Sequence, residues 1–400
     1  MDIVLVYPPS NSLDDYPTLK AQDRNMGVIP PLNLTYVSAT IEAMGHAAHV
    51  IDANALGLRP EQVAIQIKEI KPKLVGWTVA TGMFHQTLDW IRYVKEATGT
   101  LQLVGGVHVA MYPEETIFHE AIDYAAKGEA EVFLPPFLEF LDGKRRAEDV
   151  VGLVYRDAFG RPVVNADPPG IEDVDAAAFP ALHLLPIDKY CSFINKRRNF
   201  VAMITTRGCP FKCIFCSAQG KLSLRSAENV LEEIERNYHE FGVREIDFYD
   251  TTFTIDKERV VRICQGIRDR GLDILYTVRT RTDLMDEEML REMKASGCWM
   301  IMYGVESSDP EILTVMKKDA DVDDAFRTVR MTRRVGISPF GFFIFGAPGE
   351  TKDSIRRSID FAKKSGFDYV QFSKMTPFPA TPYYDMYKAL YGDFYREYVK

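Results

Sequence analysis

Three cysteines on one short segment are the residues of this sequence best suited to chemistry. Cys209, Cys213 and Cys216 follow one another at a C-x3-C-x2-C spacing. The apolar run 200–204 comes just before them, which predicts a strand that delivers a ligand loop to the end of a sheet. Thiolates are the usual ligands of iron–sulfur clusters, so three of them can hold three irons of a four-iron cluster. The fourth iron would then lack a protein ligand, which suits a cluster that binds a substrate.

Two simpler explanations fit the cysteine pattern less well. A structural zinc site needs four ligands and usually uses paired C-x2-C units, whereas Cys191, Cys264 and Cys298 are isolated in the sequence. A disulfide framework requires an even number of cysteines and an oxidising compartment. The start, MDIVLVYPPS, lacks the basic segment and cleavage site of a signal peptide. We therefore favour the iron–sulfur cluster.

Composition is that of an ordinary globular protein. The 400 residues allow two or three domains, and 46% of them are hydrophobic and 26% charged. The net charge of −9 and the lack of a basic block argue against nucleic-acid binding. No apolar run reaches the roughly 18 residues that a membrane span needs. We expect a soluble, cytoplasmic protein without a nucleic-acid partner or a membrane span.

The first 142 residues alternate predicted strands and helices, as in a parallel α/β domain. Ligands of such a domain bind beyond the carboxyl ends of the strands, and glycines there let a flat ligand approach the backbone. We predict a helix from about Leu32 to Met44, closed by Gly45. Strands are predicted over residues 3–7, 48–52, 74–78, 101–104 and 122–126.

A second alternation of strands and helices runs over residues 199–376. Glycines end helices preferentially, and each helix here is predicted to end at one. Six such units predict a partial, open (β/α)6 barrel of the TIM type, with chemistry at the carboxyl ends of its strands. The strands are predicted at 201–205, 245–249, 275–278, 300–303, 340–345 and 369–373, and the glycines are Gly242, Gly271, Gly297, Gly336 and Gly366.

The predicted fold class is therefore α/β, with four parts along the chain. Residues 1–142 form a Rossmann-like domain and residues 199–376 form the barrel. Between them, residues 143–198 form a connector with a small hairpin around Phe159-Gly160. Residues 377–400 form an aromatic-rich segment that we expect to cover apolar core.

The segment RGCPFKCIFCSAQ resembles the cluster loop of the radical S-adenosylmethionine (SAM) enzymes. With PPLNLTYVSATIEAMGH, GGVH and GEAE before it, the chain is similar to the cobalamin-dependent (B12-binding) group, which includes anaerobic magnesium-protoporphyrin IX monomethyl ester cyclases and radical SAM methyltransferases. The resemblance implies a [4Fe-4S] cluster whose open iron chelates SAM, and cobalamin on the N-terminal domain. The D-x-H-x-x-G signature of many other cobalamin proteins is absent, so no histidine is marked as a cobalt ligand. A cobalamin fold that binds nothing is the alternative.

The same resemblance implies which residues bind the cluster, SAM and cobalamin. Beside the cluster ligands Cys209, Cys213 and Cys216, Phe215 corresponds to the aromatic residue near the adenine of SAM. The ends of the later barrel strands supply the other SAM-binding candidates, for whose charged members an ordinary cap or ion pair is the alternative. These candidates are Asp250, Thr252, Arg281, Glu306, Ile344 and Gly346. The cobalamin-binding candidates are Tyr7, Pro8, Pro9, Thr78, Gly105, Gly106, His108, Gly128 and Glu129, with His108 expected to cap a helix or to lie at the cofactor's edge.

The implied reaction is the reductive cleavage of SAM to a 5′-deoxyadenosyl radical, followed by methylation of an unactivated carbon by way of methylcobalamin. The alternative keeps both cofactors and ends in cyclisation, oxidation or rearrangement. A tRNA methylthiotransferase would need a second cysteine trio and a basic RNA-binding module, which the sequence lacks. A non-enzymatic metal-binding scaffold would leave the barrel edge unexplained. We expect an oxygen-sensitive enzyme with a small-molecule substrate, large or hydrophobic, and an external electron donor such as flavodoxin or ferredoxin.

Overall fold

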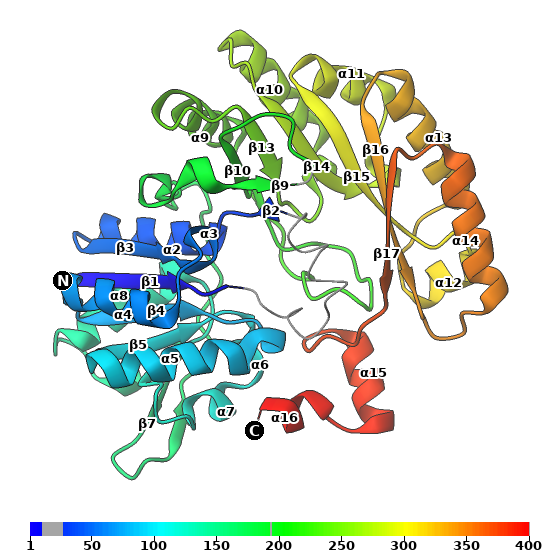
Figure 1. The fold of residues 1–400 in the computed structure, drawn as a ribbon. Coiled ribbons are helices and arrows are strands. Elements are labelled where there is room, and N and C mark those ends of the chain that lie inside the picture. The colour runs from blue at the N-terminus through cyan, green and yellow to red at the C-terminus, as the bar shows by residue number, and fades with distance from the viewer. Residues whose placement is uncertain (10–26, 193, 400) are drawn as a thin grey trace. The chain divides into compact units, whose positions relative to one another are not determined.

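The computed structural model describes residues 1–9, 27–192 and 194–399, and the chain forms two compact units (Figure 1). The first unit contains Met1–Ile194 together with Asp393–Lys400, and the second contains Asn195–Gly392. Each unit is built around its own sheet, of seven strands in the first and six in the second. Among the described residues, no helix combines the length and the apolarity that crossing a membrane requires.

The sheet of the first unit has the strand order β3-β1-β4-β5-β6-β7-β8. The strands from β3 to β6 pair in parallel, as predicted. Tyr7 pairs with Asp52 and Thr78 with Gly105, so four strands end at one edge. The strand order reverses between β1 and β4, the position where ligands bind in such sheets. The strands are β1 (Asp2–Tyr7), β3 (Ala47–Asp52), β4 (Leu74–Thr78), β5 (Leu101–Gly105), β6 (Tyr124–Ala126), β7 (Leu153–Arg156) and β8 (Pro162–Val164).

Helices cover both faces of this sheet, which is why its central strands are apolar throughout. Alternate residues of β1 enter separate cores, Val4 with α4 and α5 on one face and Ile3 with α2 and α8 on the other. The helices are α2 (Leu32–Ala43), α3 (Ala53–Leu56), α4 (Pro60–Ile70), α5 (Phe84–Thr98), α6 (Val107–Met111), α7 (Pro113–Ile117), α8 (Ala130–Leu141) and α16 (Phe394–Val399). Short 3-10 turns lie at Thr81–Met83, Ala147–Asp149, Leu182–Leu184 and Ile187–Lys189, and a small ladder joins β2 (Gly27–Val28) to β9 (Cys191–Ser192).

Two segments of the first unit differ from the simplest division of the sequence. The predicted hairpin forms, but β7 pairs antiparallel with β6, so the hairpin extends the first sheet and does not stand alone in a connector. The aromatic-rich end of the chain is divided, because α16 belongs to the first unit. There Arg396 Nε donates to Glu115 at 2.5 Å, and Tyr112 Oη donates to Asp393 at 3.4 Å.

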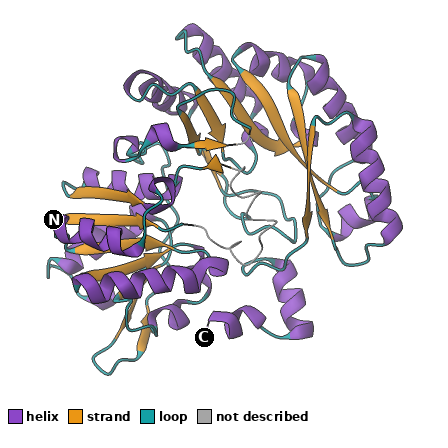
Figure 2. Ribbon diagram, in the orientation of Figure 1, coloured by secondary structure: helices purple, strands orange, loops and turns teal. Residues whose placement is uncertain are grey.

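The second unit is the predicted partial barrel of six parallel strands, in the order β10-β13-β14-β15-β16-β17. Because β10 and β17 do not pair, the barrel stays open, and all six residues of β17 are exposed. Figure 2 shows the helices of this unit along the outside of the curved sheet. The strands are β10 (Phe200–Met203), β13 (Glu245–Phe248), β14 (Leu275–Arg281), β15 (Cys298–Glu306), β16 (Ser338–Phe345) and β17 (Tyr369–Lys374), with the short pair β11 (Thr206–Arg207) and β12 (Ser223–Leu224).

Local sequence signals explain where these helices begin and end. Their first turns are capped by side chains that accept a backbone N–H, among them Ser226, Asp256 and Thr351. The five glycines predicted to end helices all have positive φ, between 63° and 107°, which glycine tolerates best. The helices are α9 (Ala227–Glu240), α10 (Lys257–Asp269), α11 (Glu287–Ala295), α12 (Pro310–Val315), α13 (Val322–Arg334), α14 (Lys352–Ser365) and α15 (Pro382–Tyr391), with 3-10 turns at Phe253–Ile255 and Thr282–Leu284.

Candidate cluster, SAM and cobalamin sites

The three cysteines lie on the loop between β11 and β12, which we call the cluster loop (residues 207–222). Because β11 and β12 pair antiparallel, the first and last residues of the loop lie next to each other. Gly208, at φ 76°, lies at this crossing, where a Cβ would come within 2.2 Å of the Lys221 carbonyl oxygen. Any larger residue would force the two ends of the loop apart, so the glycine keeps the base of the loop closed.

Hydrogen bonds order the cluster loop and tie it to the barrel. Gln219 Nε2 donates to the carbonyl oxygens of Cys213 and Cys216 at 2.7 and 3.2 Å. Ile214 N donates to the Met316 carbonyl oxygen at 3.0 Å, and Tyr383 N donates to that of Ile214 at 2.9 Å. The loop is therefore held from α12 and α15 as well as at its base.

The three thiols are free, with Cys213 buried and the other two partly exposed. Burial raises the pKa of the Cys213 thiol, while the cations of Lys318 and Arg281 lower it. Bound iron would favour the thiolate further. Within the described parts of the chain, no three His, Cys, Asp or Glu side chains converge on one metal ion. A four-iron cluster takes each protein thiolate at a separate corner, so three cysteines on one loop have the type and number of ligands that such a cluster needs.

Two predicted SAM contacts from distant parts of the chain meet beside this loop. Phe215 and Ile344 are both partly buried and pack on the same apolar group, which also contains Ile312 and Met316. Gly346, two residues further on, is exposed, has φ 95° and donates its N–H to the Glu350 carboxylate. An aromatic ring, an aliphatic side chain and an open backbone thus adjoin the cluster loop, as an adenine-binding surface requires.

Glu306 lies at the end of β15 in a buried ion pair that sequence reasoning did not identify. Lys318 Nζ donates to its Oε1 at 3.0 Å, and the two side chains are 6% and 8% exposed. Glu306 has φ 66°, an uncommon backbone conformation outside glycine. A Cβ at Gly304 would lie 2.6 Å from Glu306 Oε1, so that glycine makes room for the carboxylate. No spacing signal marks Lys318, which follows α12 in an irregular segment.

Arg281, at the end of β14, contacts the cluster loop directly. Its guanidinium lies over the ring of Phe211, 3.9 Å from the ring centre. Asp283 holds it through two hydrogen bonds of 2.9 Å, and it donates a third, of 2.7 Å, to the Asp319 carbonyl oxygen. The predicted contact of Arg281 with the SAM carboxylate stays a prediction, and Phe211 is a contact that the sequence did not reveal.

Asp250 and Thr252 lie in the buried segment that follows β13. Their side chains are 1% and 3% exposed. Asp250 accepts hydrogen bonds from the backbone N–H groups of Thr205 and Thr206 at 2.6 and 2.9 Å, and from the Thr205 hydroxyl. A direct contact between Asp250 and SAM would require these bonds to break.

The first unit gathers the proposed cobalamin-binding edge at the ends of β1, β4 and β5. Tyr7, Thr78 and Gly105 lie at this edge, since their strands are in register. Asn33 Nδ2, from α2, donates to Thr78 Oγ1 at 2.7 Å, a contact that we did not predict. Gly106 has φ 105°, and a Cβ there would lie 2.7 Å from the Val79 carbonyl oxygen. The turn after β5 therefore needs this glycine in order to pack on the turn after β4.

The remaining cobalamin-binding candidates differ in solvent exposure and in the contacts that they make. Pro8 is buried and Pro9 is partly buried, and the Pro9 carbonyl oxygen accepts from Gln86 Nε2 at 3.3 Å. A Cβ at Gly128 would lie 2.2 Å from Pro168 Cγ, and Glu129 accepts from the Ile171 N–H at 2.7 Å. Gly128 and Glu129 thus hold the segment after β8, and their contact with cobalamin stays a prediction.

His108 is inside α6 and fully buried. Its ring stacks on Phe84, with the ring centres 4.0 Å apart, and its Nδ1 lies 3.3 Å from Thr81 Oγ1. To bind cobalt, His108 would have to leave this stack, and the absence of a histidine ligand to cobalt stays a prediction. Burial, with the nearby His119 and His85, lowers the pKa of His108 from 6.5 to about 4.

We expect this buried imidazole to make the first unit less stable in mild acid. The native state keeps His108 neutral down to about pH 4, whereas an unfolded chain binds the proton near pH 6.5. Between these values the unfolded state binds more protons. The free energy of unfolding therefore decreases as the pH is lowered through this range, by at most about 3 kcal/mol. His108→Phe keeps the stack and removes the titration, so denaturant unfolding between these pH values should depend less on pH. The absorption spectrum of bound cobalamin should be the same in both proteins, and a changed cobalt spectrum would contradict the geometric argument.

Comparison with known proteins matches a family model within each of the two units. The model of the radical SAM superfamily matches residues 203–362, and that of the B12 binding domain matches residues 26–137. An uncharacterized methyltransferase of Pyrococcus horikoshii is 34% identical over 389 residues, which are 95% of this chain and 82% of that protein. The chain belongs to the cobalamin-dependent radical SAM family.

Other proteins similar to this chain include two methyltransferases and a cyclase. The cytidylyl-2-hydroxyethylphosphonate methyltransferase of Streptomyces wedmorensis is 24% identical over 87% of this chain and 76% of its own. The anaerobic magnesium-protoporphyrin IX monomethyl ester cyclase of Rubrivivax gelatinosus is 28% identical over 88% of this chain, which spans 65% of the cyclase. The radical SAM methyltransferase TsrM from Kitasatospora setae, solved with cobalamin and a [4Fe-4S] cluster, shares the fold, with a TM-score of 0.75 and 20% identity over 96% of this chain and 76% of TsrM. The predicted enzyme class and the cofactors, a [4Fe-4S] cluster, SAM and cobalamin, are confirmed.

Proposed function

We propose that this enzyme methylates an unactivated carbon of a small molecule, and that the methyl group travels from SAM by way of cobalamin. The observation that carries the proposal is the combination, in one chain, of a loop with three free thiols and a glycine-lined sheet edge at the reversal of strand order. A methyltransferase relative that matches 95% of the chain supports methyl transfer over the cyclase alternative.

Each part of the site has a task in this proposal. Cys209, Cys213 and Cys216 hold the cluster, and the apolar group around Phe215 and Ile344 takes the adenine of SAM. The buried pair of Glu306 and Lys318 places a charged group at the end of β15, where we propose that the carboxylate accepts from the ribose hydroxyls of SAM. When bound, the cofactors supply the radical and the transferable methyl group, while the protein orients them and excludes water.

Substrate size and electron supply are further parts of the proposal. The open barrel and the exposed side chains of Tyr369, Val370 and Phe372 on β17 support a large or hydrophobic substrate. Reductive cleavage of SAM consumes one electron, which a reductant must supply. We propose that an external donor such as flavodoxin or ferredoxin delivers it.

Deuterium labelling tests the proposal. The holoenzyme is given SAM that carries three deuterium atoms on its methyl group, a reductant and a metabolite extract. We expect the label first on enzyme-bound cobalamin and then on a product, because the methyl group passes through cobalt. Two SAM should be consumed for each product, and mass spectrometry of cofactor and product measures both. Consumption of SAM to 5′-deoxyadenosine and methionine with a cyclised or oxidised, unlabelled product would instead establish the alternative.

A further inference from the structure

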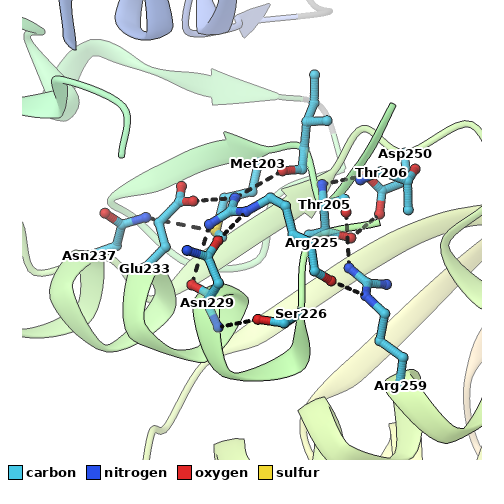
Figure 3. A network of polar contacts seen from close by, with 11 residues as sticks. Met203, Thr205, Thr206, Arg225, Ser226, Asn229, Glu233, Asn237, Asp250 and Arg259 are labelled. Atoms are coloured by element: carbon cyan, nitrogen blue, oxygen red, sulfur yellow. Dashed lines mark hydrogen bonds and ion pairs between the residues drawn. The ribbon is translucent and has the colours of Figure 1, made fainter. Parts of the chain in front are cut away.

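A buried polar network lies under the base of the cluster loop (Figure 3). Its charged members are Asp250 just after β13, Arg259 on α10, Arg225 just after β12 and Glu233 on α9. All four are at most 7% exposed. Two cations and two anions balance, which makes it tolerable to bury them.

Asp250 holds the N-terminal end of the cluster loop at Thr205 and Thr206, which we call the outgoing end; the C-terminal end at Arg225 is the returning end. Its carboxylate accepts from the N–H groups of Thr205 and Thr206 and from the Thr205 hydroxyl, all directly before the loop. These are charge-assisted bonds that a neutral group of the same shape cannot fully replace. The strand therefore enters the loop in one fixed orientation.

Arg259 joins the two ends of the loop. Its Nε donates to the Arg225 carbonyl oxygen at 2.6 Å, on the returning end, and its Nη2 donates to the Thr205 carbonyl oxygen at 3.0 Å, on the outgoing end. A single rigid guanidinium thus sets the separation of the two ends. Figure 3 shows Arg259 reaching both residues from one side.

Arg225 and Glu233 fasten the returning end to α9. Arg225 Nη1 lies 2.5 Å from Glu233 Oε2 and donates to the Ile204 carbonyl oxygen at 3.0 Å, while its Nε donates to Asn229 Oδ1 at 2.6 Å. The Arg225 side chain therefore also binds the backbone of the segment that leads into the loop, at Ile204. Both ends of the loop are held by β13, α9 and α10 at once.

We propose that Asp250, Arg259 and the Arg225–Glu233 pair are positioning residues for the cluster loop, which keep its three thiolates in the arrangement that binds the cluster. In this proposal they act on the cluster through the two ends of the loop. This inference rests on the assignment of the cluster to Cys209, Cys213 and Cys216.

Asp250→Asn and Glu245→Gln form a matched test, because each removes one charge from a residue that is 1% exposed, with Asp250 just after β13 and Glu245 at its start. Glu245 lies at the other end of the strand, where it accepts from the N–H groups of Lys196 and Arg197 at 2.8 and 2.6 Å. Anaerobically prepared holoenzyme is mixed with an iron chelator at a temperature where circular dichroism shows both variants folded. We expect Asp250→Asn to lose iron about tenfold faster than wild type or more, and Glu245→Gln to lose it at the wild-type rate.

The electron paramagnetic resonance spectrum of the reduced cluster gives a second readout that general destabilisation does not change. We expect Asp250→Asn to alter this spectrum and Glu245→Gln to leave it as in wild type. Equal iron loss and equal spectra in the two variants would overturn the inference.

Thr205 provides a milder pair in case Asp250→Asn does not fold. Thr205→Val removes the hydroxyl that donates to Asp250 and keeps the shape of the side chain, whereas Thr205→Ser retains the hydroxyl. Faster iron loss in Thr205→Val that is restored in Thr205→Ser supports the inference, while equal rates in both overturn it. Failure of the cluster assignment itself would look different, because the cysteine variants would then still bind a complete cluster.

Discussion

Replacing Cys209, Cys213 or Cys216 with alanine abolishes the reductive cleavage of SAM. Each thiolate holds one iron of the cluster, and the cysteines elsewhere are not on the loop, so none can take over. The expected loss exceeds that of any other single substitution proposed for this protein, because no radical forms without an intact cluster. Anaerobic assays of 5′-deoxyadenosine, together with iron and sulfide content, measure the effect.

Cys191→Ala and Cys264→Ala are the controls for this prediction. Cys191 is exposed on β9, and Cys264 is buried on α10, 3.5 Å from the Tyr276 hydroxyl. We expect both variants to cleave SAM, with some loss of stability in Cys264→Ala because its sulfur is packed in the core. Stoichiometric zinc with four protein ligands in anaerobically prepared protein would contradict the cluster assignment.

Lys318→Met lowers the free energy of unfolding by about 3 to 5 kcal/mol, because it leaves Glu306 as a buried charge without its cation. Both side chains are below 10% exposed, so solvent screens the pair little. Urea unfolding of the apoprotein, followed by circular dichroism, measures the loss. In the active enzyme the same change removes a cation that acts on the Cys213 thiol, so SAM cleavage should fall as well.

A double-mutant cycle separates this ion pair from simple loss of packing. Glu306→Gln in the Lys318→Met background removes the stranded charge, so the double variant should be more stable than the sum of the single effects predicts, by about 1 to 3 kcal/mol. Lys257→Met is a control on the surface of the same unit, where the lysine pairs with Asp286 while 45% exposed, and it should change the stability far less than Lys318→Met, because solvent screens the pair. Additive effects of the Glu306 and Lys318 changes would show that the two charges are not coupled.

The sequence by itself determined the elements and the chemistry that one loop can perform. The C-x3-C-x2-C spacing defines the cluster loop without reference to the fold, because all three ligands are near neighbours in the chain. The six barrel strands and the glycines between them were likewise predictable, since caps, glycine ends and apolar runs act within a few residues. The parallel order followed from the alternation of strand and helix.

Only the tertiary structure decided which charged side chains meet. The predicted contact of Asp250 with SAM stays a prediction, while the hydrogen bonds from Thr205 and Thr206 to its carboxylate became visible only in the fold. Lys318 carried no signal in the sequence, yet it pairs with Glu306 across a loop. The predicted contact of the GEAE segment with cobalamin stays a prediction, and the close approach of Pro168 to Gly128 carried no signal in the sequence.

The physical reason is the same in each case. Spacing along a chain specifies groups that are held by local backbone geometry, whereas a buried ion pair or hydrogen bond between distant segments depends on how those segments pack. Burying a charge is costly unless a partner is present, so packing and pairing are selected together. Arg225 and Arg259 illustrate this, because each takes its role from the loop ends that the folded barrel brings within reach.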